Sequence, residues 1–181
     1  MREGTESFIG EAQPSWQVEV EHLIGEAHEK KEYRPVAVAI VFDKEGKLLF
    51  VQSKKGPTDW CFPQGGVEAN EDVVAALKRE LGEETGMKGA ELKVKGFQGV
   101  KELDAEPGRA DKRGFTKGKK YFFFVVEYAG PQDLTLQAEE VTGYRWVEPG
   151  SAAQTIATTR EEKRNLMQQV LTEMGQGTGE K

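Results

Sequence analysis

The sequence predicts an α/β fold in which a mixed β-sheet is covered by helices on both faces. Apolar runs of strand length alternate along the chain with segments of helical periodicity, and this order is typical of such a sandwich. The 181 residues are 37% hydrophobic, which is enough for one compact domain with a substantial core and an additional segment. No internal repeats are present.

Four stretches of the chain carry the strand signal. Residues 36–42 are almost continuously apolar, residues 43–46 have the composition of a turn, and residues 47–52 are again β-like. Residues 36–52 are therefore predicted to form a hairpin. The further predicted strands are residues 92–100, 121–128 and 144–147.

Three segments are predicted to be helical. Residues 15–30 place apolar side chains at helical spacing, although the alternation of Trp16, Val18 and Val20 also permits a short strand. A second helix covers about residues 71–84. The third carries an apolar stripe and ends before Gly175, and the members of its stripe are Met167, Val170, Leu171 and Met174.

Charge divides the chain unevenly. The formal net charge is −6, and residues 1–32 hold eight Glu against Arg2, Lys30 and Lys31. We therefore predict an acidic extension over residues 1–32 with a disordered start at residues 1–13 and one helix, a catalytic domain over residues 33–174, and a disordered tail over residues 175–181. No run of 18 apolar residues and no signal-peptide h-region is present, so we expect a cytoplasmic protein that binds neither a membrane nor double-stranded DNA.

An acidic patch is the most informative feature of the sequence. On a helix that turns about 100° per residue, Glu80 and Glu84 lie within about 40° of each other, and Glu83 lies one side chain further round. Glu84 also falls close to the apolar face of this helix. Three carboxylates in one patch repel one another, and one at the edge of an apolar stripe is costly, so the pattern favours a hard divalent cation such as Mg²⁺.

The spacing of this segment resembles the Nudix box, G-x5-E-x7-R-E-U-x-E-E-x-G-U with U aliphatic. Every defined position matches: Gly65, Glu71, Arg79, Glu80, Leu81, Glu83, Glu84, Gly86 and Met87. The resemblance implies a Nudix-type α/β/α sandwich in which the box forms a loop, a helix and a loop beside the sheet. It also implies a metal-dependent pyrophosphohydrolase that uses Mg²⁺, with Mn²⁺ as the alternative ion.

The box residues receive distinct expected roles. Glu80, Glu83 and Glu84 would hold the metal ions, and the turn at Gly65 and Gly66 would aim a carbonyl group, that of Gly65, at an ion. Arg79 is better placed to orient the carboxylate of Glu71 by a bidentate pair than to take a metal. Gly86 can adopt the left-handed conformation that ends a helix.

The box does not fix the general base. The segment around Glu140 resembles the acidic position that supplies an extra metal ligand or a base in relatives. Glu140 is therefore the predicted base, Glu139 is its rival, and a surface acid without a catalytic role is the third interpretation.

The substrate is the more difficult question. Residues 33–35, 60–66 and 154–164 look like those of bacterial RNA pyrophosphohydrolases and dinucleoside polyphosphate hydrolases. In that group Arg34 falls on a phosphate-contacting arginine, and Lys55 lies in the loop that faces the box. Thr158 and Thr159 stand where the group has an aromatic residue and a lysine, which leaves a phosphorylated small molecule and an RNA 5′ end as alternatives.

A basic run offers a second indication of the substrate. It is either a solvated loop or an electrostatic clamp on a polyanion, and its cations are Lys112, Arg113, Lys117, Lys119 and Lys120. We assign Lys119 and Lys120 to substrate binding. Such a run would equally suit a diphosphoinositol polyphosphate.

Two further hypotheses concern functions of other classes. A catalytically inactive Nudix fold that serves as a binding module would have lost an acid of the box, and none is lost here. The helix of residues 15–30 either binds a partner or a second copy of the chain, which would give an oligomer, or packs on its own domain.

Overall fold

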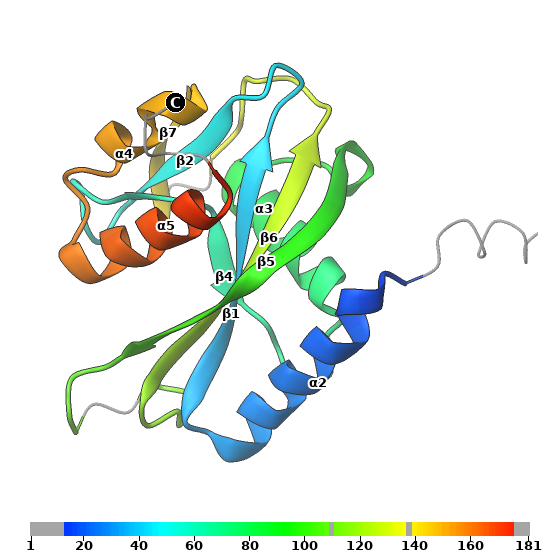
Figure 1. The fold of residues 1–181 in the computed structure, drawn as a ribbon, viewed down its shortest axis with the longest axis vertical. Helices are drawn as coiled ribbons and strands as arrows, with labels where there is room; N and C mark the ends of the chain where they lie inside the picture. The colour runs from blue at the N-terminus through cyan, green and yellow to red at the C-terminus, as the bar shows by residue number, and fades with distance from the viewer. Residues whose placement is uncertain (1–12, 109–110, 137–138, 176–181) are drawn as a thin grey trace, which may run out of the picture.

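A mixed β-sheet forms the centre of the computed structural model, which describes residues 13–108, 111–136 and 139–175 (Figure 1). Its main path runs in the order β3-β2-β1-β6-β5, with β4 paired to β1 and β7 paired to β2. The pairing of β1 with β6 is parallel, and the other pairings are antiparallel. The strands are β1 Tyr33–Phe42, β2 Leu48–Ser53, β3 Trp60–Cys61, β4 Gln64–Gly66, β5 Leu92–Asp104, β6 Gly118–Tyr128 and β7 Val141–Val147.

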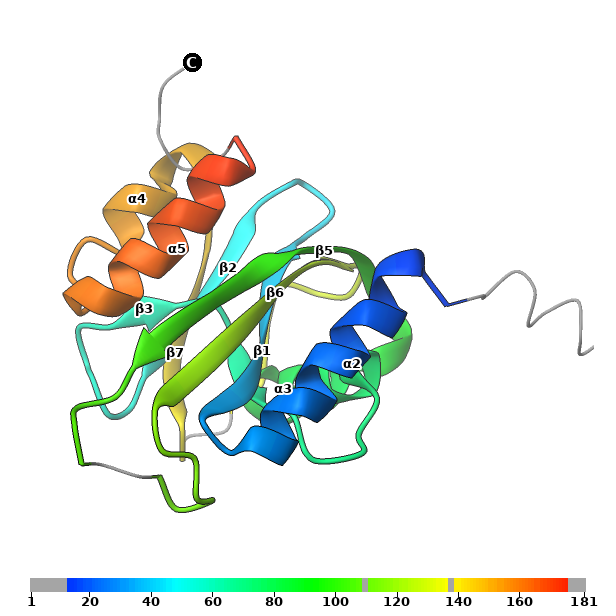
Figure 2. The same cartoon turned by 60° about the horizontal axis from the view of Figure 1, so that its bottom comes forward.

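Helices cover both faces of this sheet. Helix α2 (Ser15–Lys30) and helix α3 (Val73–Thr85) lie on one face, and the short helix α4 (Ala152–Thr155) and helix α5 (Glu161–Glu173) lie on the other (Figures 1 and 2). The predicted α/β/α sandwich with a mixed sheet is thus confirmed. None of the described helices is long and apolar enough to cross a membrane.

The central strands are buried because helices cover them on both sides. Residues 36–41 of β1 are all buried, and so are residues 121–124 of β6. Such strands have nearly continuous apolar sequences instead of alternating ones. This explains why residues 36–42 and 121–128 were recognisable in the sequence.

Helix α2 packs on the sheet of its own domain. Val20, Ile24 and Ala27 are buried, and the Trp16 ring lies 5.4 Å from the Phe124 ring between centroids. The helical interpretation of residues 15–30 is confirmed, and the alternative of a short strand is wrong. Val18, by contrast, is 65% exposed. Because the apolar stripe of α2 is used internally, the idea of an oligomer formed through this helix stays a prediction without structural support.

Several local predictions need correction. The strands β3 and β4 were not predicted, since each is only two or three residues long. The basic run is not one loop, because Lys119 and Lys120 belong to β6. Residues 154–164 span the end of α4 at Thr155, a connecting segment and the start of α5 at Glu161.

The predicted division of the chain into residues 1–32, 33–174 and 175–181 stays a prediction. The disorder predicted for residues 1–13 and 175–181 falls almost wholly outside the described part of the chain.

Candidate active site

Helix α3 holds the acidic patch, and both of its ends are fixed by the sequence. At its start the Asp72 side chain accepts a hydrogen bond from the backbone N–H of Ala75 at 2.9 Å, which satisfies a free helix-end donor. At its end Gly86 has φ 76°, and its N–H donates to the carbonyl oxygen of Gly82. The left-handed conformation predicted for Gly86 is confirmed.

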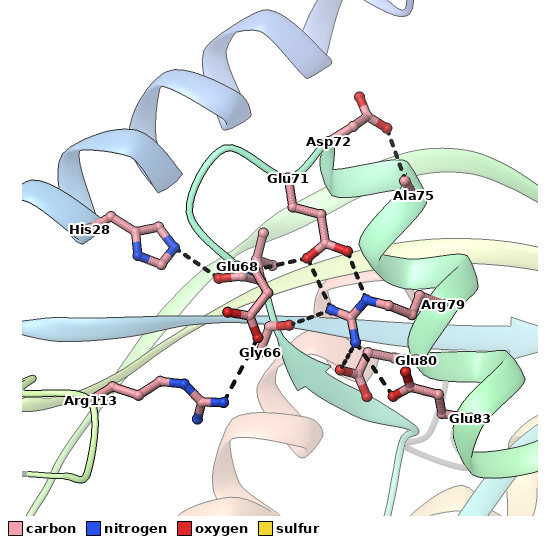
Figure 3. A network of polar contacts seen from close by, with 11 residues as sticks. His28, Gly66, Glu68, Glu71, Asp72, Ala75, Arg79, Glu80, Glu83 and Arg113 are labelled. Atoms are coloured by element: carbon pink, nitrogen blue, oxygen red, sulfur yellow. Dashed lines mark hydrogen bonds and ion pairs between the residues drawn. The ribbon is translucent and has the colours of Figure 1, made fainter.

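Arg79 is the organising side chain of the site (Figure 3). Its Nε donates to Glu71 Oε2 at 2.7 Å and its Nη2 donates to Glu71 Oε1 at 3.0 Å, which is the predicted bidentate pair. The Nη2 atom also donates to the carbonyl oxygen of Gly66 at 3.1 Å, while Nη1 reaches Glu80 at 2.8 Å and Glu83 at 3.4 Å. The bond to Arg79 holds the pKa of Glu71 below its ordinary value. One guanidinium therefore joins the loop before α3 to the acids on α3.

Glu84 is the most unusual of the acids. Its side chain is buried, and its Oε1 atom has no hydrogen-bond partner. Burial raises the pKa of Glu84 to about 8, and the negative charges of Glu80 and Glu140 add to this effect. Burial also raises the pKa of Glu80. Among the residues that the structure describes, no cation pairs with Glu84, and a backbone hydrogen bond from Gln64 is what lowers its pKa.

Gly65 allows Glu80 to lie where it does. A Cβ atom on Gly65 would overlap the carboxylate of Glu80. The turn therefore leaves room for an acid of α3 against the backbone of β4. The predicted use of the Gly65 carbonyl as a metal ligand stays a prediction.

The acids fit a divalent cation by their chemistry. Within the described residues no three His, Cys, Asp or Glu side chains converge into a preformed metal cluster. Carboxylate oxygens are nevertheless the ligands that Mg²⁺ prefers, and the unpaired Oε1 of Glu84 lies buried beside a second acid whose pKa is raised. Glu80, Glu83 and Glu84 are the residues that could hold such an ion.

Glu139 and Glu140, which precede β7, lie across a small cavity from the acids of α3. Both line a cavity of about 370 Å³ together with Glu83 and Glu84. Both are exposed. The charge of Glu140 contributes to the raised pKa of Glu80 and of Glu84, which indicates that this side chain lies near them. The choice of Glu140 over Glu139 as the base stays a prediction.

A wall of cations faces the acidic patch across a larger cavity of about 640 Å³. Arg34 and Lys119 lie side by side in the parallel register of β1 and β6. The Arg34 guanidinium rests on Gly66, where a Cβ atom would overlap it. Desolvation lowers the pKa of Lys119, and the positive charges of Lys163, Arg34 and Lys55 lower it further. Four cations thus share one region of the cavity wall.

The structure does not bring every predicted substrate contact to this cavity. Lys112, Arg113 and Lys119 line it, whereas Lys117 and Lys120 do not. The Lys120 ammonium pairs with Glu102 at 3.4 Å. Lys119 and Lys120 are neighbours on a strand, so their side chains point to opposite faces of the sheet. The assignment of Lys120 to substrate binding is therefore corrected.

Sequence reasoning missed Lys163, which lines the cavity from α5. Thr158 and Thr159, which stand where the similar group has an aromatic residue and a lysine, supply no cation themselves. Those two side chains instead hold the loop before β3, since Thr158 Oγ1 donates to the Thr58 carbonyl oxygen and Thr159 Oγ1 bonds both backbone groups of Trp60. Lys163 is the third residue of α5, and no local signal in the sequence indicated that it lines the cavity.

The comparison with known families identifies this arrangement. A family model described as NUDIX domain matches residues 32–170. The chain belongs to the Nudix family. Family membership supports a hydrolase, and the acidic patch of α3 lies within the matched range.

Related proteins share its sequence over most of its length. An RNA pyrophosphohydrolase of Sphingopyxis alaskensis is 27% identical over 155 residues, which are 82% of this chain and 96% of that protein. An RNA pyrophosphohydrolase of Caulobacter vibrioides is 32% identical over 126 residues, which are 64% of this chain and 72% of that protein.

Solved structures share its fold at lower identity. An Ap4A hydrolase of C. elegans in a binary complex superimposes with a TM-score of 0.60 at 21% identity, covering 78% of this chain and 95% of that one. The dihydroneopterin triphosphate pyrophosphohydrolase of E. coli gives a TM-score of 0.59 at 20% identity, covering 76% and 96%. These structures confirm the fold of this Nudix chain.

Proposed function

We propose that this Nudix protein hydrolyses a pyrophosphate bond in a nucleoside polyphosphate-type substrate with the help of a divalent cation. The observation that carries the proposal is the cavity of about 640 Å³ with walls of opposite charge. Acids of α3 form one wall, and cations from β1, the loop after β2, β6 and α5 form the other. A chain of phosphates with its counter-ion requires both walls at once.

The acidic wall would hold the ion. Glu80, Glu83 and Glu84 are its candidate ligands, with Glu140 as a further one. A bound divalent ion supplies neutralising charge for the phosphates and lowers the pKa of a bound water. Arg79 keeps these acids oriented through its bonds to Glu80 and Glu83.

The role proposed for Glu140 is to accept the proton of the attacking water. Its side chain is exposed in the cavity, opposite Glu84, so water has access to it. A positioned carboxylate of this kind accelerates a reaction by removing a proton as the new bond to phosphorus forms. Glu139 lines the same cavity and is the alternative base.

The cationic wall would bind phosphate oxygens. Arg34, Lys55, Lys119 and Lys163 offer charged donors to the non-bridging oxygens, and the arginine can bind two of them at once. Four cations suit three or more consecutive phosphates. Dinucleoside polyphosphates and 5′-triphosphorylated RNA both meet this requirement, and proteins that act on such compounds are among the relatives.

A hydrolysis screen tests the proposal. Triphosphorylated RNA, dinucleoside polyphosphates, nucleotide sugars and a diphosphoinositol polyphosphate are each incubated with the chain, with Mg²⁺, with Mn²⁺ and with a chelator. We expect ion-dependent hydrolysis of one of the first two classes. Triphosphorylated RNA would release phosphate or pyrophosphate, and a dinucleoside polyphosphate would give two mononucleotides. Hydrolysis of only the inositol compound would replace the proposed substrate by that alternative.

The matched control is Glu84→Gln, which keeps the shape of the side chain. Loss of a ligand to a catalytic ion costs a factor of about 10³ or more in turnover. Turnover of the folded variant within about tenfold of wild type would contradict the assignment of the ion site. Binding of substrates without hydrolysis by the wild-type chain would identify a binding module instead.

A further inference from the structure

The turn of residues 111–117 delivers two cations to the cavity from outside the sheet. Lys112 and Arg113 line the cavity, although both are exposed and belong to no helix or strand. The Asp111 side chain accepts hydrogen bonds from the backbone N–H of Arg113 at 2.9 Å and of Phe115 at 3.0 Å, and Gly114 has φ 91°. The turn therefore has a defined internal conformation.

Phe115 anchors this turn to α2. Its side chain is 2% exposed, whereas its neighbours in the turn are exposed. It lies outside the main hydrophobic core and contacts the C-terminal end of α2. The His28 ring meets its ring edge-on at 5.8 Å, and the Lys31 ammonium lies 4.6 Å from its centroid. An apolar side chain buried at this place stabilises the docked position of the turn.

Backbone hydrogen bonds hold the same contact. The N–H of Thr116 donates to the carbonyl oxygen of Lys31 at 3.0 Å, and the N–H of Lys117 donates to that of Glu32 at 2.6 Å. Lys31 has φ 58°, so the chain turns sharply where α2 ends. The two residues that follow α2 therefore present their carbonyl groups to the turn.

His28 connects α2 to the other side of the cavity as well. Its Nε2 lies 2.8 Å from the carbonyl oxygen of Val67, just after the glycine pair of the box. Arg113 in turn reaches Glu68 of the same loop at 3.8 Å (Figure 3). The turn and the loop before α3 thus share one support. This support lies in residues 15–31, outside the matched range of residues 32–170.

We propose that α2 positions the turn of residues 111–117 through Phe115, so that Lys112 and Arg113 contact the substrate beyond the phosphates held by Arg34 and Lys119. Phe115 is a positioning residue, and the two cations determine specificity for longer or more highly charged substrates. This inference rests on the proposed function. Helix α2, which belongs to the acidic segment of residues 1–32, would then support the substrate cavity of the same chain.

The kinetic test uses the full chain and the substrate hydrolysed fastest in the screen. Phe115→Ala is expected to raise KM about tenfold at low salt and to leave kcat within about twofold, because the charged contacts are lost while the acids of α3 stay in place. Phe115→Leu keeps apolar volume and is expected to restore most of the affinity. Lys120→Ala is the matched control for charge and is expected to leave KM unchanged, since Lys120 does not line the cavity.

A double-mutant cycle shows whether Phe115 acts through the two cations. The variant carrying Lys112→Ala and Arg113→Ala is expected to raise KM as much as Phe115→Ala does. Adding Phe115→Ala to it is expected to change KM by less than about twofold, because residues that act through one another are not additive. Full additivity would overturn the positioning role.

A proteolysis readout is independent of activity. Trypsin cleaves after Lys112 and Arg113 when the turn leaves its docked position, and the first fragments are identified by mass spectrometry. Cleavage there is expected to be at least about fivefold faster in Phe115→Ala than in wild type or Lys120→Ala. Equal cleavage rates would overturn the anchoring, and faster cleavage with an unchanged KM would overturn the role in substrate binding. Faster cleavage in a chain that hydrolyses none of the substrates would contradict the proposed function alone.

Discussion

Glu84→Gln is expected to stabilise the metal-free protein. The carboxyl group of Glu84 is buried, one of its oxygens has no partner, and its pKa is raised from 4.5 to about 8. Because the folded state binds the Glu84 proton more tightly than the unfolded state does, the contribution of Glu84 to stability is fully present below pH 4.5 and is lost as the pH rises towards 8. A neutral amide of the same shape removes this cost.

The size of this stabilisation follows from the pKa shift of Glu84. One pKa unit corresponds to about 1.4 kcal/mol, so holding the Glu84 proton at pH 7 costs on the order of 3 kcal/mol relative to an unperturbed glutamate. For a chain of this length that difference moves the unfolding midpoint by roughly 5–10 °C. Glu83→Gln is the matched control, because the Glu83 side chain is 61% exposed and its change should shift the midpoint little.

The assay is thermal unfolding in a chelating buffer between pH 5 and pH 8, followed by the same series with Mg²⁺. The stability difference between Glu84→Gln and wild type should widen as the pH rises. Mg²⁺ should then stabilise wild type more than the variant, since an ion that binds only the folded state shifts its midpoint by mass action. A difference independent of pH, or equal stabilisation of both proteins by Mg²⁺, would refute the reasoning.

Three further changes test the site. Glu140→Gln should lower kcat by about 10²–10⁴ with little change in KM. If Glu140→Gln leaves kcat unchanged and Glu139→Gln lowers it, Glu139 is the base. Arg79→Lys should lower both kcat and the unfolding midpoint, because an ammonium group cannot form the bidentate pair; wild-type kinetics would show that the pair is dispensable. Lys119→Ala should raise KM by a factor that shrinks at high salt, whereas Lys120→Ala should have no effect at any salt concentration; equal effects of the two would contradict the assignment of strand faces.

The site was predictable where its geometry is local. Glu80 and Glu84 share a helix face, and Arg79 reaches Glu71 within the same loop and helix, so spacing alone predicted their relations. The burial of Glu84 followed from its angle to the apolar stripe of the same helix. Local sequence could determine these features because the residues are only a few turns apart.

Non-local features were harder to predict. Nothing near Lys163 in the sequence indicates that α5 brings it to the cavity, and nothing near Phe115 indicates that it packs against α2. The error at Lys120 was avoidable, since alternation along a strand separates it from Lys119 once β6 is extended to Gly118. The short strands β3 and β4 lie in a Pro- and Gly-rich stretch, where no periodicity can develop.

The parallel pairing of β1 with β6 has a consequence for folding. Arg34 and Lys119 are neighbours only because two strands far apart in the sequence are hydrogen bonded in register. Contacts of such long sequence separation form late, since the closure of a long loop must precede them, whereas the acids of α3 come together with a single helix. A polyphosphate that spans both walls would therefore bind only to the fully folded chain. Such a compound should act as a ligand chaperone that slows unfolding of this protein without accelerating its folding.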